Sequence, residues 1–171
     1  MKIVLVGYMY AGKTTVGKRI ANMLNFSFVD TDKRVEEICL QSVEEIFDRV
    51  GEEYFRQKER EVFLSLLKED NIVIATGGGL PCYKDNMNLI NLYCKSIYLE
   101  LSPAQIFSRL NKSNNIRPLL KNIKSEDRLE FIETSLQARE SFYRKADITL
   151  SALSINKEEL EKRINELFRR L

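Results

Sequence analysis

The sequence predicts an α/β fold built around a parallel β-sheet. Short, nearly continuous apolar runs alternate with segments of helical periodicity, and the first run leads directly into a glycine-rich loop. Apolar strands joined by helices are typical of a parallel sheet covered by helices on both faces. The predicted strands cover residues 3–6, 26–29, 72–75, 97–101 and 148–150. A chain of 171 residues can bury one core well, so we expect a single domain over residues 1–171.

Several helix boundaries are marked in the sequence. The segments 42–45 (SVEE) and 156–159 (NKEE) have the spacing of a capping box at a helix start. The segment 102–105 (SPAQ) adds a proline at the first helical position, where proline is favoured. Gly51 follows the helical stretch 43–50 and predicts its end.

A phosphate-binding loop follows the first strand. Residues 7–14 match G-x-x-x-x-G-K-[ST], and a helix with an apolar face follows. Glycines at this position allow successive N–H groups to converge on phosphates, and the helix N-terminus adds a positive dipole end. We expect Lys13 to reach the β- and γ-phosphates and the Thr14 hydroxyl to bind Mg²⁺. The predicted nucleotide contacts are Gly7, Tyr8, Met9, Tyr10, Ala11, Gly12, Lys13, Thr14 and Thr15.

Composition excludes several other classes of protein. The chain has 27 Lys and Arg against 25 Asp and Glu, so its charge does not indicate a nucleic-acid or membrane surface. It has no histidine, which excludes a Ser-His-Asp triad and an H-E-x-x-H metal site. Three cysteines without a C-x-x-C pair favour a reduced compartment, and no apolar stretch is long enough to span a membrane. The first strand starts near Met1, so we expect no signal peptide and a cytoplasmic protein.

Two aspartates lie at the end of the second predicted strand. Asp30 and Asp32 are alternating neighbours in the sequence, so we expect both to face the ligand crevice at the carboxyl edge of the sheet. One carboxylate is then suited to hold Mg²⁺ through water, and the other to position an acceptor hydroxyl. The alternative is a solvated acidic turn that caps the next helix.

Two arginines and a glycine run are suited to bind a small carboxylic acid. Arg56 and Glu59 lie three residues apart on a predicted helix, where a surface ion pair is the default interpretation. The third strand runs into three glycines, residues 77–79, which let the backbone approach a ligand closely. Arg139 lies on a later helix. Arginine forks bind carboxylates in a bidentate manner, so these arginines and the glycine N–H groups form a candidate acceptor site.

Residues 111–124 lie between two helices and are polar and basic apart from residues 116–120. We predict that this segment is a mobile lid, because its polar residues offer little burial to hold it in place. Two GTPase-like matches in the chain are best interpreted as coincidences. The D-x-x-G match at residues 48–51 lies at a helix end, and the segment 111–114 lacks the acidic fourth residue of N-K-x-D. The absence of an aspartate-terminated Walker B strand also argues against large motor ATPases.

Taken together, these motifs resemble those of shikimate kinases. The likeness runs from residue 1 to about residue 150 and comprises, in order, GYMYAGKTTVGK, FVDTD with Glu36, GEEYFRQKE, ATGGG, RPLL and ARESFYRKAD. The resemblance implies a P-loop, nucleoside-monophosphate-kinase-like three-layer fold whose five-stranded parallel sheet has the order 2-3-1-4-5. It also implies Mg²⁺-dependent transfer of the ATP γ-phosphoryl group to shikimate, a step of aromatic amino-acid biosynthesis.

The resemblance further implies a role for each matched residue. Asp30 matches the metal-associated aspartate, and Asp32 matches the one that holds the acceptor hydroxyls. Arg117 matches the lid arginine that closes on the transferred phosphate, so Lys13, Asp32 and Arg117 are the implied catalytic set. Arg109 is placed to contact the nucleotide. The implied acceptor-binding region covers about residues 30–62, and the acceptor-site residues are Asp32, Arg56, Glu59, Gly77, Gly78, Gly79 and Arg139.

Two other functions remain open at the level of sequence. Gluconate kinases and other small-molecule P-loop kinases share the loop and the lid, so acceptor specificity depends on the aspartate, arginine and glycine set. A non-catalytic nucleotide-binding module is the second alternative. The intact Lys13, Thr14, Asp30 and Arg117 argue against it, because a degenerate relative is expected to have lost at least one of them. We expect a monomer that binds ATP and shikimate and neither nucleic acid nor membrane.

Overall fold

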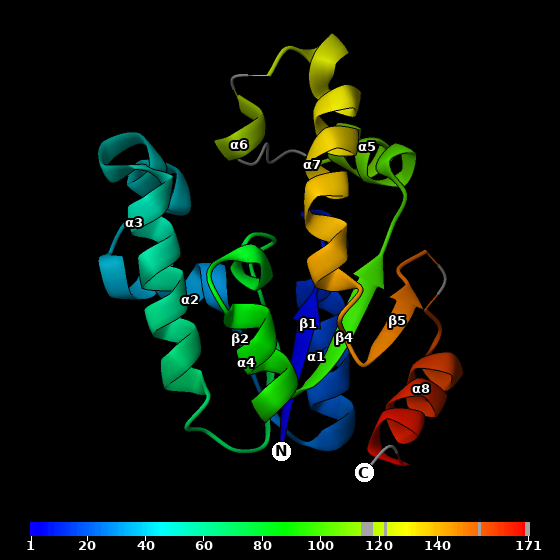
Figure 1. Ribbon diagram of the computed structural model, residues 1–171. Helices are drawn as coiled ribbons and strands as arrows, with labels where there is room; N and C mark the ends of the chain where they lie inside the picture. Colours follow the sequence, from blue (N-terminus) through cyan, green and yellow to red (C-terminus); the bar gives the residue numbers. More distant parts are fainter. Residues whose placement is uncertain (114–117, 122, 154, 170–171) are drawn as a thin grey trace.

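A single five-stranded parallel sheet organises the molecule (Figure 1). The computed structural model describes residues 1–113, 118–121, 123–153 and 155–169. The strand order is β2-β3-β1-β4-β5, which confirms the order 2-3-1-4-5. All four strand pairings are parallel. The strands are β1 (Lys2–Val6), β2 (Ser27–Asp30), β3 (Ile72–Ala75), β4 (Lys95–Glu100) and β5 (Ile148–Ser151).

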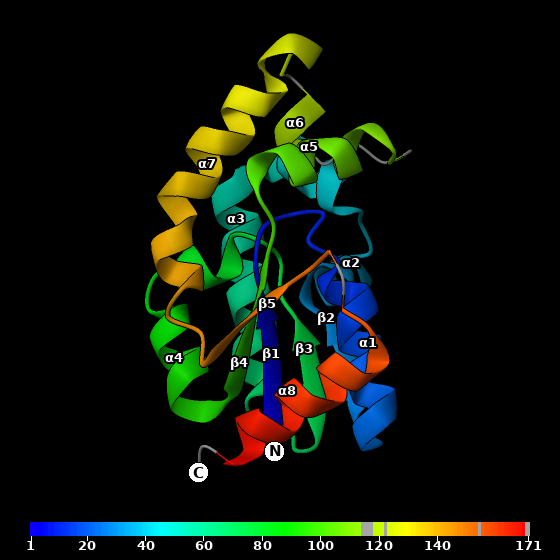
Figure 2. The same cartoon turned by 90° about the vertical axis from the view of Figure 1, so that its right-hand side faces the viewer.

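Helices cover both faces of the sheet and extend beyond its carboxyl edge. Figure 2 shows α4 and α7 on one side of the sheet, α1 and α8 on the other, and α5 and α6 above the strand ends. The α-helices are α1 (Lys13–Leu24), α2 (Thr31–Cys39), α3 (Val43–Leu66), α4 (Asn86–Tyr93), α5 (Pro103–Asn111), α6 (Pro118–Lys121), α7 (Arg128–Tyr143) and α8 (Lys157–Arg169). Two short 3₁₀ turns, η1 (Leu80–Cys82) and η2 (Ser125–Asp127), complete the described elements. No helix among these residues has both the length and the apolar character to cross a membrane.

The predicted helix boundaries have clear physical causes. Complete capping boxes start α3 at Ser42 and α5 at Ser102, where each side chain accepts the N–H three residues later. At α8, Asn156 Oδ1 accepts the Glu159 N–H at 2.8 Å. Gly51 interrupts α3 with a φ of 86°, a left-handed angle that glycine adopts without strain. The helix beginning at Val43 therefore ends where predicted, and a second helical segment continues to Leu66.

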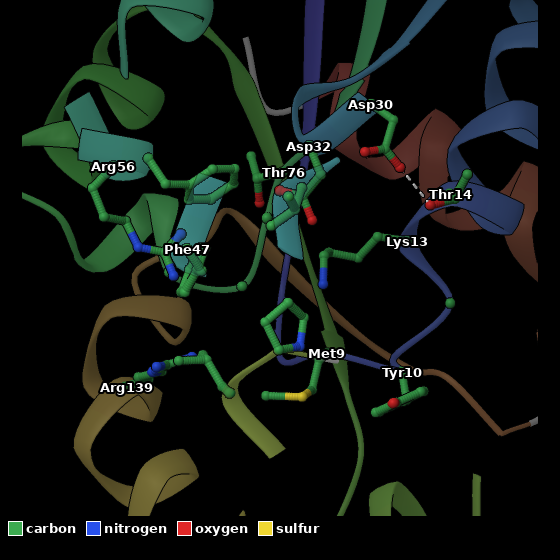
Figure 3. Close-up of a pocket in the computed structure, with 18 of the residues that line it drawn as sticks. Met9, Tyr10, Lys13, Thr14, Asp30, Asp32, Phe47, Arg56, Thr76 and Arg139 are labelled. Carbon is green, nitrogen blue, oxygen red and sulfur yellow. Dashed lines mark hydrogen bonds between the residues drawn. The ribbon is translucent and has the colours of Figure 1, made fainter. Parts of the chain in front are cut away.

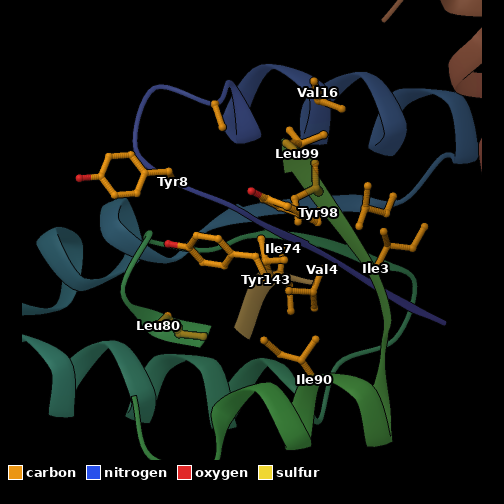
Figure 4. Packing of buried hydrophobic residues seen from close by; sticks show 14 of the residues in the cluster. Ile3, Val4, Tyr8, Val16, Ile74, Leu80, Ile90, Tyr98, Leu99 and Tyr143 are labelled. Atoms are coloured by element: carbon orange, nitrogen blue, oxygen red, sulfur yellow. The ribbon is translucent and has the colours of Figure 1, made fainter. Parts of the chain in front are cut away.

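The core lies on both faces of the central strand β1. Ile3, Val4, Leu5 and Val6 are fully buried, because helices pack on both sides of this strand (Figure 4). β1 pairs with β3 on one side and β4 on the other, so the carboxyl ends of these strands meet at one edge. The loops that follow β1, β2 and β3 are thereby brought together, and this is where the functional side chains gather.

Candidate active site

A cavity of about 230 Å³ opens at the carboxyl edge of the sheet (Figure 3). Residues predicted for the phosphate site and for the acceptor site both line it. In Figure 3, Arg56 and Arg139 lie on one side, Thr14 and Asp30 on the other, with Lys13 and Asp32 between them. The predicted site residues in its lining are Met9, Tyr10, Gly12, Lys13, Thr14, Thr15, Asp30, Asp32, Arg56, Gly77, Gly78, Gly79 and Arg139.

The phosphate loop has the backbone shape that its glycines predicted. Gly7 has a φ of 142° and Gly12 a φ of 89°, and a Cβ at Gly7 would lie 2.7 Å from the Leu99 carbonyl oxygen. Helix α1 starts at Lys13, so its free N–H groups face the loop. The buried Lys13 ammonium donates to the Gly7 and Tyr8 carbonyl oxygens, each at 2.8 Å. Lys13 thus closes the loop on itself and holds a positive charge at its centre.

A hydroxyl and a carboxylate meet beside this loop. Thr14 Oγ1 donates to Asp30 Oδ2 at 2.6 Å, joining the start of α1 to the end of β2. These are hard oxygen ligands of the kind Mg²⁺ prefers, and Mg²⁺ usually keeps several waters and phosphate oxygens as its other ligands. The pair therefore fits the ion. No group of three or more metal-ligating Asp, Glu, Cys or His side chains occurs among the described residues.

The expected strand geometry of the two aspartates is wrong. Asp30 ends β2, but α2 begins at Thr31, so Asp32 lies in the first turn of a helix. Asp30 also caps that helix by accepting the Lys33 N–H at 3.4 Å, as in the alternative interpretation. Asp32 still lines the cavity, because the helix begins directly at the sheet edge.

Arg56 and Glu59 form a buried pair, so the default interpretation as a surface ion pair is wrong. Arg56 Nη1 donates to Glu59 Oε2 at 2.6 Å, and the Glu59 side chain is 1% exposed. Thr31 Oγ1 donates to the second Glu59 oxygen at 3.3 Å. Burial raises the pKa of the Glu59 carboxyl to about 7; Arg56 opposes this shift, and the nearby Asp32 carboxylate adds to it. Glu59 does not line the cavity itself, but its ion pair holds the Arg56 guanidinium in place.

The three glycines after β3 pack tightly against these side chains. A Cβ at Gly77 would collide with carboxylate oxygens of Glu59 and Asp32, and one at Gly79 would collide with the Arg56 guanidinium. Gly78 is less restricted, since the nearest atom to a Cβ there would be the Met9 nitrogen at 3.4 Å. The lack of side chains in the glycine run thus leaves room for side chains from α2 and α3. The sequence pattern had instead predicted that these glycines let a ligand approach the backbone closely.

Arg139 reaches the cavity from α7 and lies over an aromatic ring of the phosphate loop. Its guanidinium is 5.6 Å from the centroid of the Tyr8 ring, within the range of a cation–π contact. The buried Tyr143 hydroxyl, one turn further along α7, donates to the Gly78 carbonyl oxygen at 2.5 Å. These contacts fix the end of α7 against both the phosphate loop and the glycine run.

One wall of the cavity is apolar, and the sequence pattern did not predict it. The rings of Phe47 and Phe55 stand 5.1 Å apart on the two segments of α3. Apolar residues at helical spacing are usually core, so nothing in the pattern distinguished these from Ile46 or Phe63. The missed lining residues are Val43, Phe47, Phe55, Thr76, Pro118 and Leu119.

The lid segment is only partly described. Pro118 and Leu119 of α6 line the cavity, Leu120 is fully buried, and Lys121 pairs with Glu44 of α3. The expectation that this segment has little to bury is therefore wrong for α6. Arg117, the implied lid arginine, lies outside the described residues.

Arg109 lies beside the phosphate loop, at its outer side. It donates to the Tyr10 carbonyl oxygen at 2.9 Å and to the Ala152 carbonyl oxygen at 2.6 Å. It therefore links the loop to the chain that follows β5. Among the remaining predicted residues, Gly7, Tyr8, Ala11 and Arg109 shape or border the loop without lining the cavity.

The fold and the site together define a P-loop phosphotransferase. A glycine loop with a lysine and a hydroxyl–carboxylate pair faces a pair of arginines across one cavity, an arrangement suited to a phosphoryl donor beside an anionic acceptor. The family model described as shikimate kinase matches residues 9–170, and this chain belongs to that family.

Individual relatives agree with this assignment. The shikimate kinase of Parabacteroides distasonis is 41% identical over 151 residues, which cover 88% of this chain and 87% of the relative. The crystal structure of shikimate kinase from Bacteroides thetaiotaomicron has a TM-score of 0.88 at 37% identity, covering 99% of this chain and 98% of that one. The enzyme from Acinetobacter baumannii, solved in complex with shikimate, has a TM-score of 0.81 at 30% identity, with coverages of 99% and 91%. A gluconokinase from Sinorhizobium meliloti, at 13% identity and a TM-score of 0.65, shares the fold alone.

Proposed function

We propose that this protein transfers the γ-phosphoryl group of ATP to a hydroxyl of shikimate, giving shikimate 3-phosphate and ADP. The observation that carries the proposal is the single cavity in which the phosphate loop and the paired arginines face each other. Phosphoryl transfer depends mainly on positioning and on neutralising charge, and both requirements can be met by these side chains.

The phosphate loop is proposed to bind and orient the donor. Phosphate oxygens replace the Gly7 and Tyr8 carbonyls as partners of Lys13, and the N–H groups of the loop and of the start of α1 hold the β-phosphate. Thr14 and Asp30 are the proposed holders of Mg²⁺, Asp30 through water. An ion held there would supply positive charge to neutralise the phosphate oxygens of the donor. Arg109 is proposed to contact the nucleotide from the outer side of the loop.

The acceptor is proposed to lie between Asp32 and the two arginines. Asp32 accepts hydrogen bonds from acceptor hydroxyls and orients the one that attacks, while Arg56 and Arg139 bind the carboxylate with the Gly77, Gly78 and Gly79 backbone. Glu59 holds the Arg56 fork in place. The Phe47 and Phe55 rings supply an apolar surface for the ring of the acceptor.

The lid is proposed to close over this assembly. We assign to Arg117 the stabilisation of the negative charge that develops on the transferred phosphoryl group. This role needs a cation that reaches the phosphoryl group when the lid closes. The acceptor-binding region is proposed to cover about residues 30–62 and the lid about residues 111–124, within one domain. We further propose that the protein acts as a monomer, and its three free thiols support a cytoplasmic location.

An acceptor panel tests the proposal. ADP release is measured with ATP and Mg²⁺ in the presence of shikimate, gluconate or AMP, in the parent protein and in Asp32→Asn. We expect rapid release with shikimate and little with the others, because only shikimate carries a carboxylate and ring hydroxyls in one rigid arrangement. Asp32→Asn should bind ATP normally and lose most of the turnover, since Asp32 lies outside the phosphate loop. ADP release that is independent of any acceptor would contradict the proposal.

A further inference from the structure

Arg56 has two carboxylate partners within the chain itself. Glu59 accepts from Nη1 at 2.6 Å, while a single oxygen of Glu52 accepts from both Nη2 and Nε, at 3.0 and 3.2 Å. The Nη2–Nε edge is one of the two faces of a guanidinium that can hold a carboxylate in a bidentate manner. Glu52 therefore covers a face of Arg56 that is suited to an acceptor carboxylate.

The two glutamates are held very differently. The Glu59 side chain is 1% exposed and also accepts from Thr31, whereas the Glu52 side chain is 47% exposed. Glu52 stands directly after Gly51, where α3 is interrupted. Removing one partner of a fully buried pair leaves an uncompensated charge in the interior, whereas a partner that reaches solvent is rehydrated when its contact is lost. Glu52 is thus the partner that can be exchanged.

The charges around Arg56 favour this exchange. An acceptor carboxylate that bound while both glutamates stayed beside the Arg56 guanidinium would place three carboxyl groups around two arginines, and like charges at such distances oppose each other. Glu52 also borders a shallow hollow outside the cavity that Arg56, Gly79 and Arg139 line as well. Glu52 therefore borders the same hollow as both arginines of the candidate acceptor site.

We propose that Glu52 is a specificity-determining residue that competes with the acceptor carboxylate for Arg56. This rests on the proposed function, in which Arg56 and Arg139 bind that carboxylate. A ligand whose carboxylate binds both Arg56 and Arg139 makes up for the Glu52–Arg56 contact that it displaces. A small inorganic anion that binds Arg56 alone only exchanges one contact for another and gains little. The apparent affinity for the acceptor is lowered in proportion to the fraction of molecules in which Glu52 covers Arg56.

The test is the variant Glu52→Gln, which keeps the size of the side chain and removes its charge. We expect the KM for shikimate to fall about three- to tenfold while kcat changes by less than about twofold, since Glu52 does not face the phosphate loop. Inorganic sulfate, used as a small anionic probe, should become a stronger inhibitor in competition with shikimate. The matched control is Glu161→Gln on α8, the same charge change at a side chain that is also 47% exposed and pairs at i, i+4 spacing, with Lys157, and it should leave both measurements unchanged.

An unchanged or higher KM in Glu52→Gln would overturn the inference, because Glu52 would then only hold Arg56 in position or form an ordinary surface pair. Arg56→Ala, measured in parallel by calorimetry, separates this result from a failure of the proposed function. If Arg56→Ala binds shikimate much more weakly than the parent, the carboxylate site stands and only the role of Glu52 is lost. If Arg56→Ala binds shikimate as tightly as the parent, the acceptor site itself is wrongly assigned.

Discussion

Gly77 shows how closely the side chains of the site pack on the main chain. Its N–H donates to Thr31 Oγ1 at 2.9 Å, and the carboxylates of Asp32 and Glu59 occupy the space that a Cβ would need. The residue is glycine because three functional elements, β3, α2 and α3, converge at this point. A side chain here would push Asp32 out of its position and press on a buried ion pair.

Gly77→Ala should therefore lower both turnover and stability. We expect at least a tenfold loss of kcat and a loss of about 1–3 kcal/mol in the free energy of unfolding, as is usual for overpacking a well-filled site. Urea unfolding and the ADP-release assay measure the two effects. Gly78→Ala is the control for stability, because its Cβ would keep 3.4 Å from the nearest atom. Equal stability losses in the two variants would show that the carboxylates are not what restricts Gly77.

At the scale of elements, α6 is a short helix with one fully buried side chain, that of Leu120, and a partly buried one, that of Leu119. Leu120 is fully buried, while the neighbouring Lys121–Glu44 pair has both side chains more than 40% exposed. Burial of a leucine is worth about 1.5–3 kcal/mol, and an exposed ion pair much less. The position of α6 over the cavity therefore depends on Leu120.

Leu120→Ala should release α6 while leaving the sheet intact. We expect faster amide hydrogen exchange in residues 118–121, unchanged exchange in β1 and β3, and a turnover loss larger than that of Lys121→Ala. Exchange followed by mass spectrometry gives the first measurement and the ADP-release assay the second. If Lys121→Ala were as harmful as Leu120→Ala, the ion pair would be the main attachment.

Most elements could be predicted because their signals are local. The capping boxes at Ser42 and Ser102 and the apolar runs of the strands depend on a few adjacent residues, and they gave α3, α5 and all five strands within a few residues. Asp32 was misplaced because Asp30 caps α2, so the helix begins at Thr31 and the strand does not continue to Asp32. The helix α6 was missed because four residues are too few to show a period.

The site was predictable to the extent that its residues are chemically distinctive. Packing alone seldom places a lysine and a threonine after a glycine loop, or an arginine near a glycine run, whereas Phe47 and Phe55 look like any core residue on a helix. The burial of the Arg56–Glu59 pair could not be predicted either, because the i, i+3 spacing is the same for a pair on the surface and for a pair in the core. Only packing against β3 and α2 distinguishes the two cases.

At the scale of the whole molecule, the absence of histidine makes Glu59 important for the response to pH. The pKa of its buried carboxyl is raised to about 7, and the chain has no imidazole to titrate in the same range. A carboxyl whose pKa is higher in the folded state binds a proton on folding between its ordinary pKa and about 7. Its contribution to stability is therefore lost as pH rises through about 7.

The free energy of unfolding should consequently be higher at pH 5.5 than at pH 8, by about 1 kcal/mol or more. Urea midpoints at the two pH values measure the difference, and Glu59→Gln should remove most of it, because an amide does not titrate. Lys58, the residue before Glu59, provides a surface control as Lys58→Gln, which should keep the pH dependence of the parent. A parent protein whose stability rises from pH 5.5 to pH 8 would contradict the assignment of this shift to Glu59.

The central place of β1 has a consequence for how the molecule is made. β1 is synthesised before the other strands of the sheet, yet its two hydrogen-bonded neighbours are β3 and β4, which begin at Ile72 and Lys95. The strand that carries the phosphate loop thus gains its first lateral partner only after residue 75 and its second only after residue 100, when more than half of the chain has been synthesised. During that time its apolar residues are exposed, and long-range pairing of this kind is slow and prone to aggregation. The nascent chain is therefore most dependent on chaperones before residue 100 emerges, and the nucleotide can help folding only after that point.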